Sequence, residues 1–335
     1  MKSAVMVLPG GATWRTLASP VVEAPHLLSG VAAASPAEIW VAGHAGQQPL
    51  LARWDGAAWT VPSGPEPDAA LIGAGVQGVA LTSGPVRAIA VGGGYDRLRG
   101  AEVPLIRHWN GSSWSAADTP EPATGYVLTD VTAAGGEAWA VGHGFPWGVA
   151  GTVALHWTGT DWLPAAMPEI PKGKLLAVSA LAAGDVWAVG ADDRSSLIMH
   201  FDGQAWTRVP APATRFPLTD VTAVAPDQAW AVGRDRVLHW NGRRWKRVKA
   251  PVTAANTVAA SAPDDVWVAG GEGELAHYDG HRWTVTAVPR PNGATTVWLA
   301  STATPDGVCL VGSHQVVRTG QVDSDSAISA QSTDN

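Results

Sequence analysis

Short apolar runs separated by polar turns recur along the whole chain. In the clearest copy the runs cover residues 218–224, 229–233, 234–240 and 243–248, and they are rich in Val, Trp and Thr. Pro, Asp, Asn and Gly separate one run from the next. The apolar positions lack the 3.6-residue period of a helix, so the pattern predicts four β-strands joined by tight turns. We call these strands A to D in chain order.

The same four-strand unit recurs seven times. Each strand B closes on a glycine, and these glycines are Gly43, Gly92, Gly142, Gly190, Gly233, Gly270 and Gly312. A spacing of about 40–50 residues is typical of one propeller blade. The sequence therefore predicts an all-β fold, a seven-bladed β-propeller with four antiparallel strands per blade.

Tryptophan occupies fixed positions in this repeat, and 16 of the 18 Trp fall on them. Strand B carries one Trp, strand C ends in an aromatic residue before an Asp-Gly or Asn-Gly type turn, and strand D begins with another Trp. Large rings at a repeated position predict packing between blades. The histidines that recur in strand C are predicted to be structural for the same reason, and they are His108, His156, His200, His239 and His277.

The last blade lacks a strand D at the C-terminal end. Residues 11–17 carry the Gly-x-x-Trp spacing of the other C–D junctions, which predicts that the N-terminal strand completes the last blade. Such closure removes open sheet edges. The predicted organisation is an extension at 1–10, one propeller domain at 11–320 with blade seven split between 295–320 and 11–19, and a disordered tail at 321–335.

Composition narrows the classes of partner. The net charge is −7, and the single Cys309 excludes an internal disulfide and a cysteine-based metal site. The densest basic cluster, Arg243, Arg244, Lys246 and Arg247, lies on one hairpin and is interpreted as a solvated blade edge, so we expect no nucleic-acid partner. No apolar run reaches the length of a signal peptide core or a membrane span, which predicts a cytoplasmic protein without membrane contact. We also expect the protein to be a monomer.

The order of apolar-apolar-Gly, aromatic-Asp/Asn-Gly and Trp-x-x-Val-Pro resembles kelch-type and galactose-oxidase-like propellers, and it is also similar to tectonin repeats. The segments at 185–190 and 200–203 are similar to repeats common in high-GC Gram-positive, actinobacterial proteins. The resemblance covers 11–320. Most blades have one glycine where kelch repeats have two. These families include enzymes, lectins and scaffolds, so the resemblance implies a fold and leaves the function open.

Irregular loops point to one face of the propeller. The B–C and D–A connections open on the same face, which we call the loop face. The B–C connection extends from Gly92 to Trp109 in blade two and from Gly142 to Trp157 in blade three, but only from 233 to 240 in blade five. Long loops on a rigid scaffold commonly carry binding or catalysis. We therefore expect a site on the loop face, over blades one to three and the channel mouth.

Five residues are candidates for acid–base chemistry. His44, His143 and His314 follow strand B glycines, and Asp130 and Asp220 share one position in strand A, near the predicted channel axis. Histidines titrate near neutral pH, and two nearby carboxylates can share a proton or a cation. A solvated loop histidine and an aspartate that accepts backbone amides are the structural alternatives. No cofactor is required by the sequence, and a divalent metal is one option.

Six residues are candidates for ligand binding: Trp147, Trp298, Arg234, Tyr95, Asp192 and Glu272. Trp147 lies in a long loop, where it either stacks on a ligand or packs back onto the loop. Trp298 aligns with small residues of strand A such as Ala32, which predicts that its ring narrows one side of the channel or forms the floor of a pocket. Compensation for the missing ring at Cys309 is the alternative.

Two functions follow from this pattern. The first is a binding propeller that holds a small molecule, a glycan or a protein on the loop face. The alternative is a metal- or acid/base-dependent lyase, isomerase or cyclase at the channel mouth, including one in a bacterial secondary-metabolite pathway. A lectin would repeat its site in every blade. Nucleophile-elbow, Walker and His-Glu-x-x-His motifs are absent, and whether the protein is an enzyme stays open.

Overall fold

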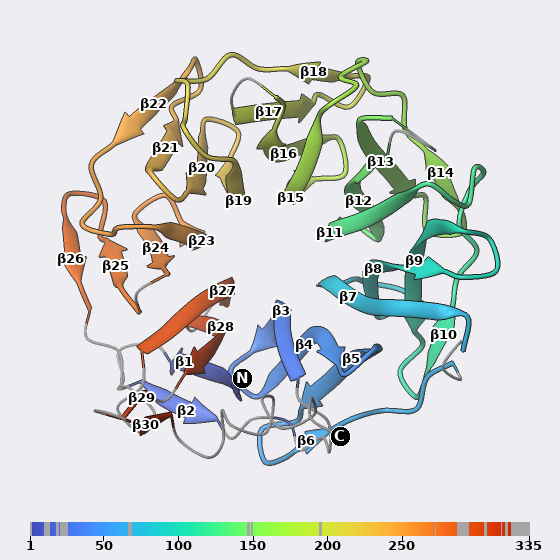
Figure 1. The fold of residues 1–335 in the computed structure, drawn as a ribbon. Coiled ribbons are helices and arrows are strands. Elements are labelled where there is room, and N and C mark those ends of the chain that lie inside the picture. The colour runs from blue at the N-terminus through green and yellow to red at the C-terminus, as the bar shows by residue number, and fades with distance from the viewer. Residues whose placement is uncertain are drawn as a thin grey trace.

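The computed structural model is a ring of seven four-stranded antiparallel sheets around a central channel (Figure 1). It describes residues 2–9, 14–17, 20, 26–65, 69–145, 148, 150–193, 196–271, 273–286, 295–304, 307–315, 317–318 and 321–322. The seven blades and their all-β, antiparallel construction confirm the fold prediction. In the described part of the chain, no helix is long and apolar enough to span a membrane.

The first three blades follow each other in the chain. Blade one contains β3 (His26–Ser35), β4 (Glu38–Ala45), β5 (Gln48–Trp54) and β6 (Trp59–Thr60). Blade two contains β7 (Leu71–Leu81), β8 (Ala88–Asp96), β9 (Ala101–Trp109) and β10 (Trp114–Ala116). Blade three contains β11 (Tyr126–Ala134), β12 (Glu137–Gly144), β13 (Thr152–Trp157) and β14 (Trp162–Pro164).

The next three blades repeat this order. Blade four contains β15 (Lys174–Ala182), β16 (Asp185–Ala191), β17 (Ser196–Phe201) and β18 (Trp206–Arg208). Blade five contains β19 (Leu218–Ala225), β20 (Gln228–Gly233), β21 (Arg236–Trp240) and β22 (Trp245–Val248). Blade six contains β23 (Ala255–Ala262), β24 (Asp265–Gly270), β25 (Leu275–Tyr278) and β26 (Trp283–Val285).

Blade seven joins both ends of the chain. Its sheet orders β27 (Thr295–Thr304), β28 (Gly307–Gln315), β1 (Lys2–Pro9) and β2 (Arg15–Leu17) from the channel outward. The N-terminus thus completes the last blade, but it supplies two strands rather than one.

This arrangement corrects the predicted boundaries of blade seven. Residues 1–10 are not an extension, because Lys2–Pro9 pairs with β28 along its whole length. The segment predicted as strand C instead forms β29 (Val317–Arg318), which pairs with β30 (Gln321–Val322) in a separate two-stranded sheet. The apolar side chains of β1 explain its place, since Val5, Met6 and Val7 are buried. Residues 323–335, part of the predicted tail, lie outside the described residues.

The repeated glycine of strand B has a steric cause. Each strand A contains a β-bulge opposite this glycine, as between Leu28 and Gly30 in blade one. The bulge brings a strand A carbonyl against strand B, so a Cβ at Gly43 would lie 1.9 Å from the Leu27 oxygen. The same clash exists at Gly190 with the Lys174 oxygen, also at 1.9 Å. Only glycine fits this close approach.

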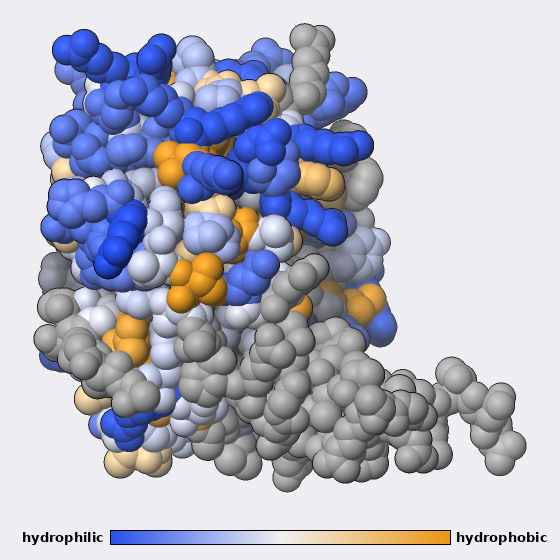
Figure 2. All heavy atoms as spheres, turned by 90° about the vertical axis from the view of Figure 1, so that its left-hand side faces the viewer, coloured by the Kyte–Doolittle hydropathy of each residue, from blue (hydrophilic) through white to orange (hydrophobic). Residues whose placement is uncertain are grey.

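Indole rings fill the wedges between blades. Trp187 of β16 lies 5.1 Å from Trp240 and 5.2 Å from Trp245, both in blade five. The same contact joins Trp40 to Trp109 and Trp114, Trp139 to Phe201 and Trp206, Trp230 to Tyr278 and Trp283, and Trp267 to Trp14. The predicted inter-blade packing is therefore confirmed. Polar residues cover much of the outer surface, as the side view of blades five and six shows (Figure 2).

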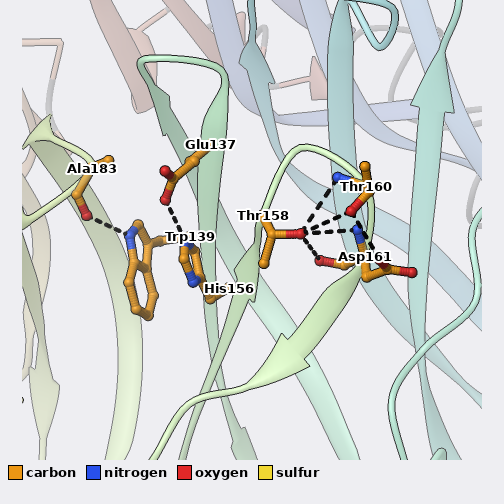
Figure 3. A network of polar contacts seen from close by, with 7 residues as sticks. All are labelled: Glu137, Trp139, His156, Thr158, Thr160, Asp161 and Ala183. Atoms are coloured by element: carbon orange, nitrogen blue, oxygen red, sulfur yellow. Dashed lines mark hydrogen bonds and ion pairs between the residues drawn. The ribbon is translucent and has the colours of Figure 1, made fainter.

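The repeated histidines complete this packing. In blade three the His156 ring stacks on Trp139 at 4.3 Å, and its Nε2 lies 2.6 Å from a Glu137 oxygen (Figure 3). Trp139 in turn donates Nε1–H to the Ala183 carbonyl of blade four, at 3.1 Å. His200, His239 and His277 stack in the same way in the next three blades. The prediction that these side chains are structural is confirmed.

Replacing one of these histidines tests their contribution to stability. His156→Ala is expected to lower the free energy of unfolding by about 1–2 kcal/mol, because the stacked ring and its polar contact with Glu137 are both lost. Urea denaturation measures this change. His281→Ala, at an exposed turn position, is the matched control and is expected to stay within about 0.5 kcal/mol. Equal effects of the two substitutions would contradict the structural role.

Candidate functional site: the central channel and the loop face

The innermost strands of all seven blades enclose a cavity of about 370 Å³ along the channel. The strands β3, β7, β11, β15, β19, β23 and β27 contribute mostly small side chains, namely Gly, Ala, Val, Ser and Thr. Asp130 and Asp220 are the only ionisable residues in this lining. The channel lining therefore offers two carboxyl groups among hydroxyl, amide and small apolar side chains.

Both aspartates connect their own blade to the next one. The Asp130 carboxylate accepts hydrogen bonds from the backbone N–H of Val131 at 2.8 Å and of Val178, in blade four, at 2.9 Å. Asp220 accepts from the N–H of Val221 and of Val258, in blade six, both at 2.8 Å. The Thr257 hydroxyl donates a third hydrogen bond to the Asp220 carboxylate, at 2.7 Å. These contacts match the structural alternative for the two residues.

Burial shifts the titration of both carboxyl groups. Desolvation raises the pKa of Asp130 to about 7, and the charge of Asp220 adds to this increase, while the hydrogen bonds from Val178 and Val131 oppose it. Desolvation also raises the pKa of Asp220 to about 6, against its three hydrogen bonds. Both groups therefore change protonation close to neutral pH.

Other strand A side chains form a similar set of contacts between blades, which the sequence analysis missed. The Thr132 hydroxyl accepts from the Ala180 N–H at 3.1 Å, and the Ser179 hydroxyl accepts from the Ala223 N–H at 3.0 Å. Thr219 donates to the Asn256 carbonyl at 2.9 Å. The available signal was the recurrence of Ser, Thr and Asp on a strand otherwise made of Ala and Val.

The candidate histidines do not join the aspartates. His44 on β4 and His143 on β12 are both half-buried, and neither lines the channel cavity. Burial and the positive charge of Lys174 lower the pKa of His143, and its Nδ1 is buried without a hydrogen-bond partner. His314 lies on β28 opposite Lys2, and its side chain is outside the described part. No three His, Cys, Asp or Glu side chains among the described residues could together hold a metal ion.

The predicted alignment of Trp298 with Ala32 is wrong, because the residue equivalent to Ala32 lies four positions later in the chain. Trp298 pairs with Gly312, and Thr302 pairs with Cys309, so Thr302 takes the place equivalent to Ala32. Trp298 is 1% exposed and packs between blades six and seven. Its ring therefore belongs to the core and does not narrow the channel.

The remaining ligand-binding candidates are spread over the surface. The Arg234 guanidinium lies 5.3 Å from the centre of the Phe216 ring. Asp192 forms an ion pair with Arg208 at 2.8 Å, which directs it toward strand D of its own blade. Tyr95 is 40% exposed on the long hairpin of blade two. Trp147 and Glu272 lie outside the described residues.

That hairpin projects from the loop face. Strands β8 and β9 continue past Gly92, and the turn between them carries Leu98, which is 88% exposed. Asp96 fixes this turn, because its carboxylate accepts from the N–H of Leu98 at 2.8 Å and of Arg99 at 3.1 Å. The Arg97 N–H also donates to the Ala70 carbonyl, at 3.0 Å. The length of this loop is visible in the sequence, whereas the exposure of the leucine at its tip is not.

Comparison with solved structures supports the assignment of the β-propeller fold. No family model and no curated protein matches this sequence. The solved structure "YCF48 bound to D1 peptide" is similar, with a TM-score of 0.61, 16% identity, and coverage of 90% of this chain and 95% of that one. Virginiamycin B lyase from Staphylococcus aureus has a TM-score of 0.63 at 11% identity, covering 93% and 100% of the two chains. The RRP9 WD40 repeats have a TM-score of 0.62 at 11% identity, covering 92% and 99%. At such identities the similarity shows the β-propeller fold alone.

Proposed function

We propose that this propeller binds a partner protein through its loop face, with the hairpin tip of blade two as the central contact. The observation that carries this proposal is a large apolar side chain, Leu98, held in solvent by a fixed turn. At 88% exposure the Leu98 side chain buries little apolar surface in the fold, so it is expected to contribute little to stability. A hydrogen-bonded turn presents it in one conformation, so little conformational entropy is lost on binding.

The surroundings of Leu98 suit a protein contact. Arg97 and Arg99 flank it, and Tyr95 is partly exposed on the same hairpin. Arginine and tyrosine around an apolar centre are typical of binding hot spots. The peptide present in the YCF48 structure supports peptide binding as one use of this architecture.

The alternative function, an acid–base enzyme at the channel, has less support. Asp130 and Asp220 are its only candidates in the channel lining, and both carboxylates already accept backbone amides of the next blade. The candidate histidines lie elsewhere. A glycan or small-molecule ligand, a monomeric state, and a kelch-type or tectonin-type ancestry stay predictions.

The hairpin tip is tested by replacing its leucine. Leu98→Ser is expected to weaken the affinity for the partner at least about tenfold while leaving the free energy of unfolding nearly unchanged, because only the exposed apolar surface is removed. The immobilised protein first retains partners from a lysate of its source cells, and the affinity of the purified partner is then measured by calorimetry.

Val285→Ser is the matched control, since Val285 is 67% exposed on the outer strand of blade six. A partner retained by the wild type and by Val285→Ser, but lost from Leu98→Ser, supports the proposal. If every retained protein binds all three forms equally, the hairpin tip is not the contact.

A further inference from the structure

The distribution of charge along the chain is strongly uneven. Residues 206–249, which include all of blade five, carry nine Lys and Arg against three Asp, a net charge of +6. The rest of the chain carries 13 basic and 26 acidic residues, a net charge of −13. One of the three aspartates, Asp220, is also buried in the channel wall. Blade five itself, residues 218–248, carries six Lys and Arg against three Asp, a net charge of +3, and the connections on either side of it add further cations to an otherwise acidic chain.

Part of this charge surrounds a hollow on the loop face. The hollow has a volume of about 480 Å³ and lies between the B–C turn of blade five and the connection that leaves β22. Its cations are Arg236, Arg247 and Lys249, and its only acidic residue is Asp235. Apolar side chains form the rest of the lining, namely Val237, Val248, Ala250, Val252 and Ala255. The hollow thus combines an aliphatic surface with a net positive charge.

The contacts inside the hollow leave positive charge available. Asp235 forms an ion pair with Arg236 at 3.3 Å, so these two charges offset each other, and the Nε of Arg236 and one carboxylate oxygen of Asp235 are both buried without a hydrogen-bond partner. Arg247 donates to a neutral group, the carbonyl oxygen of Ala213, at 2.5 Å. Lys249 is exposed. Arg247 and Lys249 are therefore the cations of the hollow that a carboxylate of a ligand can reach.

Protection of a sheet edge does not explain these cations. Charged residues on edge strands prevent pairing with other chains. However, β6, β10, β14 and β26 contain no Lys or Arg, and β2 and β18 contain one arginine each, so the fold does not require several cations on an outer strand. Arg236 and Lys249 also lie outside β22, in β21 and in the connection after β22.

We propose that this hollow binds an acidic peptide segment of a partner, with carboxylates on the Arg247 and Lys249 side and aliphatic side chains on the valines. The inference goes beyond the hairpin contact of blade two, because it concerns a second surface, across the ring from it (Figure 1), and a partner of defined charge.

A synthetic peptide tests the proposal without knowledge of the natural partner. The probe is a fluorescein-labelled peptide of alternating Asp and Val, and the same peptide with Asn in place of Asp is its uncharged match. Fluorescence anisotropy is expected to show binding of the Asp peptide that weakens as NaCl is added, and at least about tenfold weaker binding of the Asn peptide.

A pair of double variants places the binding site. Arg247→Gln with Lys249→Gln is expected to weaken the Asp peptide about tenfold. Arg243→Gln with Arg244→Gln removes the same charge from the opposite end of β22 and is expected to change the affinity less than about twofold. Circular dichroism verifies folding, and Lys249→Gln alone is the substitute if the first variant does not fold.

Three results would overturn the inference: equal binding of the Asn peptide, equal loss in the two double variants, or displacement of the peptide by a single-stranded RNA oligonucleotide at equal phosphate charge. Leu98→Ser is expected to leave peptide binding unchanged. Failure of this surface and failure of the hairpin contact are therefore distinguishable.

Discussion

Raising the pH from about 5 to about 8 is expected to lower the free energy of unfolding of the wild type by about 3 kcal/mol more than that of Asp130→Asn. The cause is the pKa of Asp130, which burial raises from 3.8 to about 7 in the folded protein. Between these two values the folded state holds a proton that the unfolded state lacks, so stability decreases as the pH rises. Above about 7 the carboxyl group is ionised in both states, and its contribution becomes constant.

The difference between the two proteins reports the Asp130 carboxyl group together with its electrostatic coupling to Asp220, whose charge contributes to the raised pKa of Asp130. Burial lowers the pKa of His108, His143 and His239. Their effect on the free energy of unfolding is opposite to that of Asp130, because they reduce stability as the pH falls below 6.5. They are present in both proteins and cancel. Asn at position 130 offers one acceptor oxygen in place of two, which lowers stability by the same amount at every pH. The slope of the difference is therefore the quantity to compare.

Urea denaturation at intervals of pH measures this slope. Asp202→Asn is the control, since Asp202 is exposed and its backbone hydrogen bonds from Ala205 and Gln204 lower its pKa, which moves its titration below this pH range. Wild type and Asp202→Asn are expected to run parallel. If the free energies of unfolding of the wild type and of Asp130→Asn change in parallel with pH, the pKa of Asp130 is not raised in the folded protein.

The fold was predictable because its main determinants recur. The strand B glycine is required by a bulge in every blade, and the Trp positions are required by every wedge, so seven copies report the same constraint. Strand C of blade seven has no such repeat signal. β1 ends at Pro9 without an aromatic-Asp/Asn-Gly turn, and its place is decided by burial of Val5, Met6 and Val7 against β28 and the neighbouring blades.

The site was harder to predict because it depends on register and exposure. A bulge between Trp298 and Ala300 decides whether a side chain faces the core or the channel, and Gly312 indicates that a bulge is present without fixing which strand A residue pairs with it. Asp130 and Asp220 were correctly placed near the channel, but their hydrogen bonds to the next blade are long-range contacts. Leu98 differs from a core leucine only through the length of the hairpin that carries it.

Met6→Ala is expected to lower the free energy of unfolding by about 2–5 kcal/mol, which makes it the most damaging single substitution considered for the first nine residues. Met6 is fully buried and packs with Trp267, Trp298 and Leu310, so its loss opens a cavity where both ends of the chain meet. The substitution acts on β1, the strand that the sequence analysis took for an extension.

Two controls distinguish closure of blade seven by β1 from closure by residues 317–320. Thr16→Ala changes the exposed residue opposite Met6 on β2 and is expected to cost less than about 1 kcal/mol. A chain that ends at residue 316 is expected to keep most of its stability, because β1 rather than 317–320 pairs with β28. If that truncated chain loses as much stability as Met6→Ala, the pairing of β1 with β28 is contradicted. Residues 317–320 would then be the third strand of blade seven.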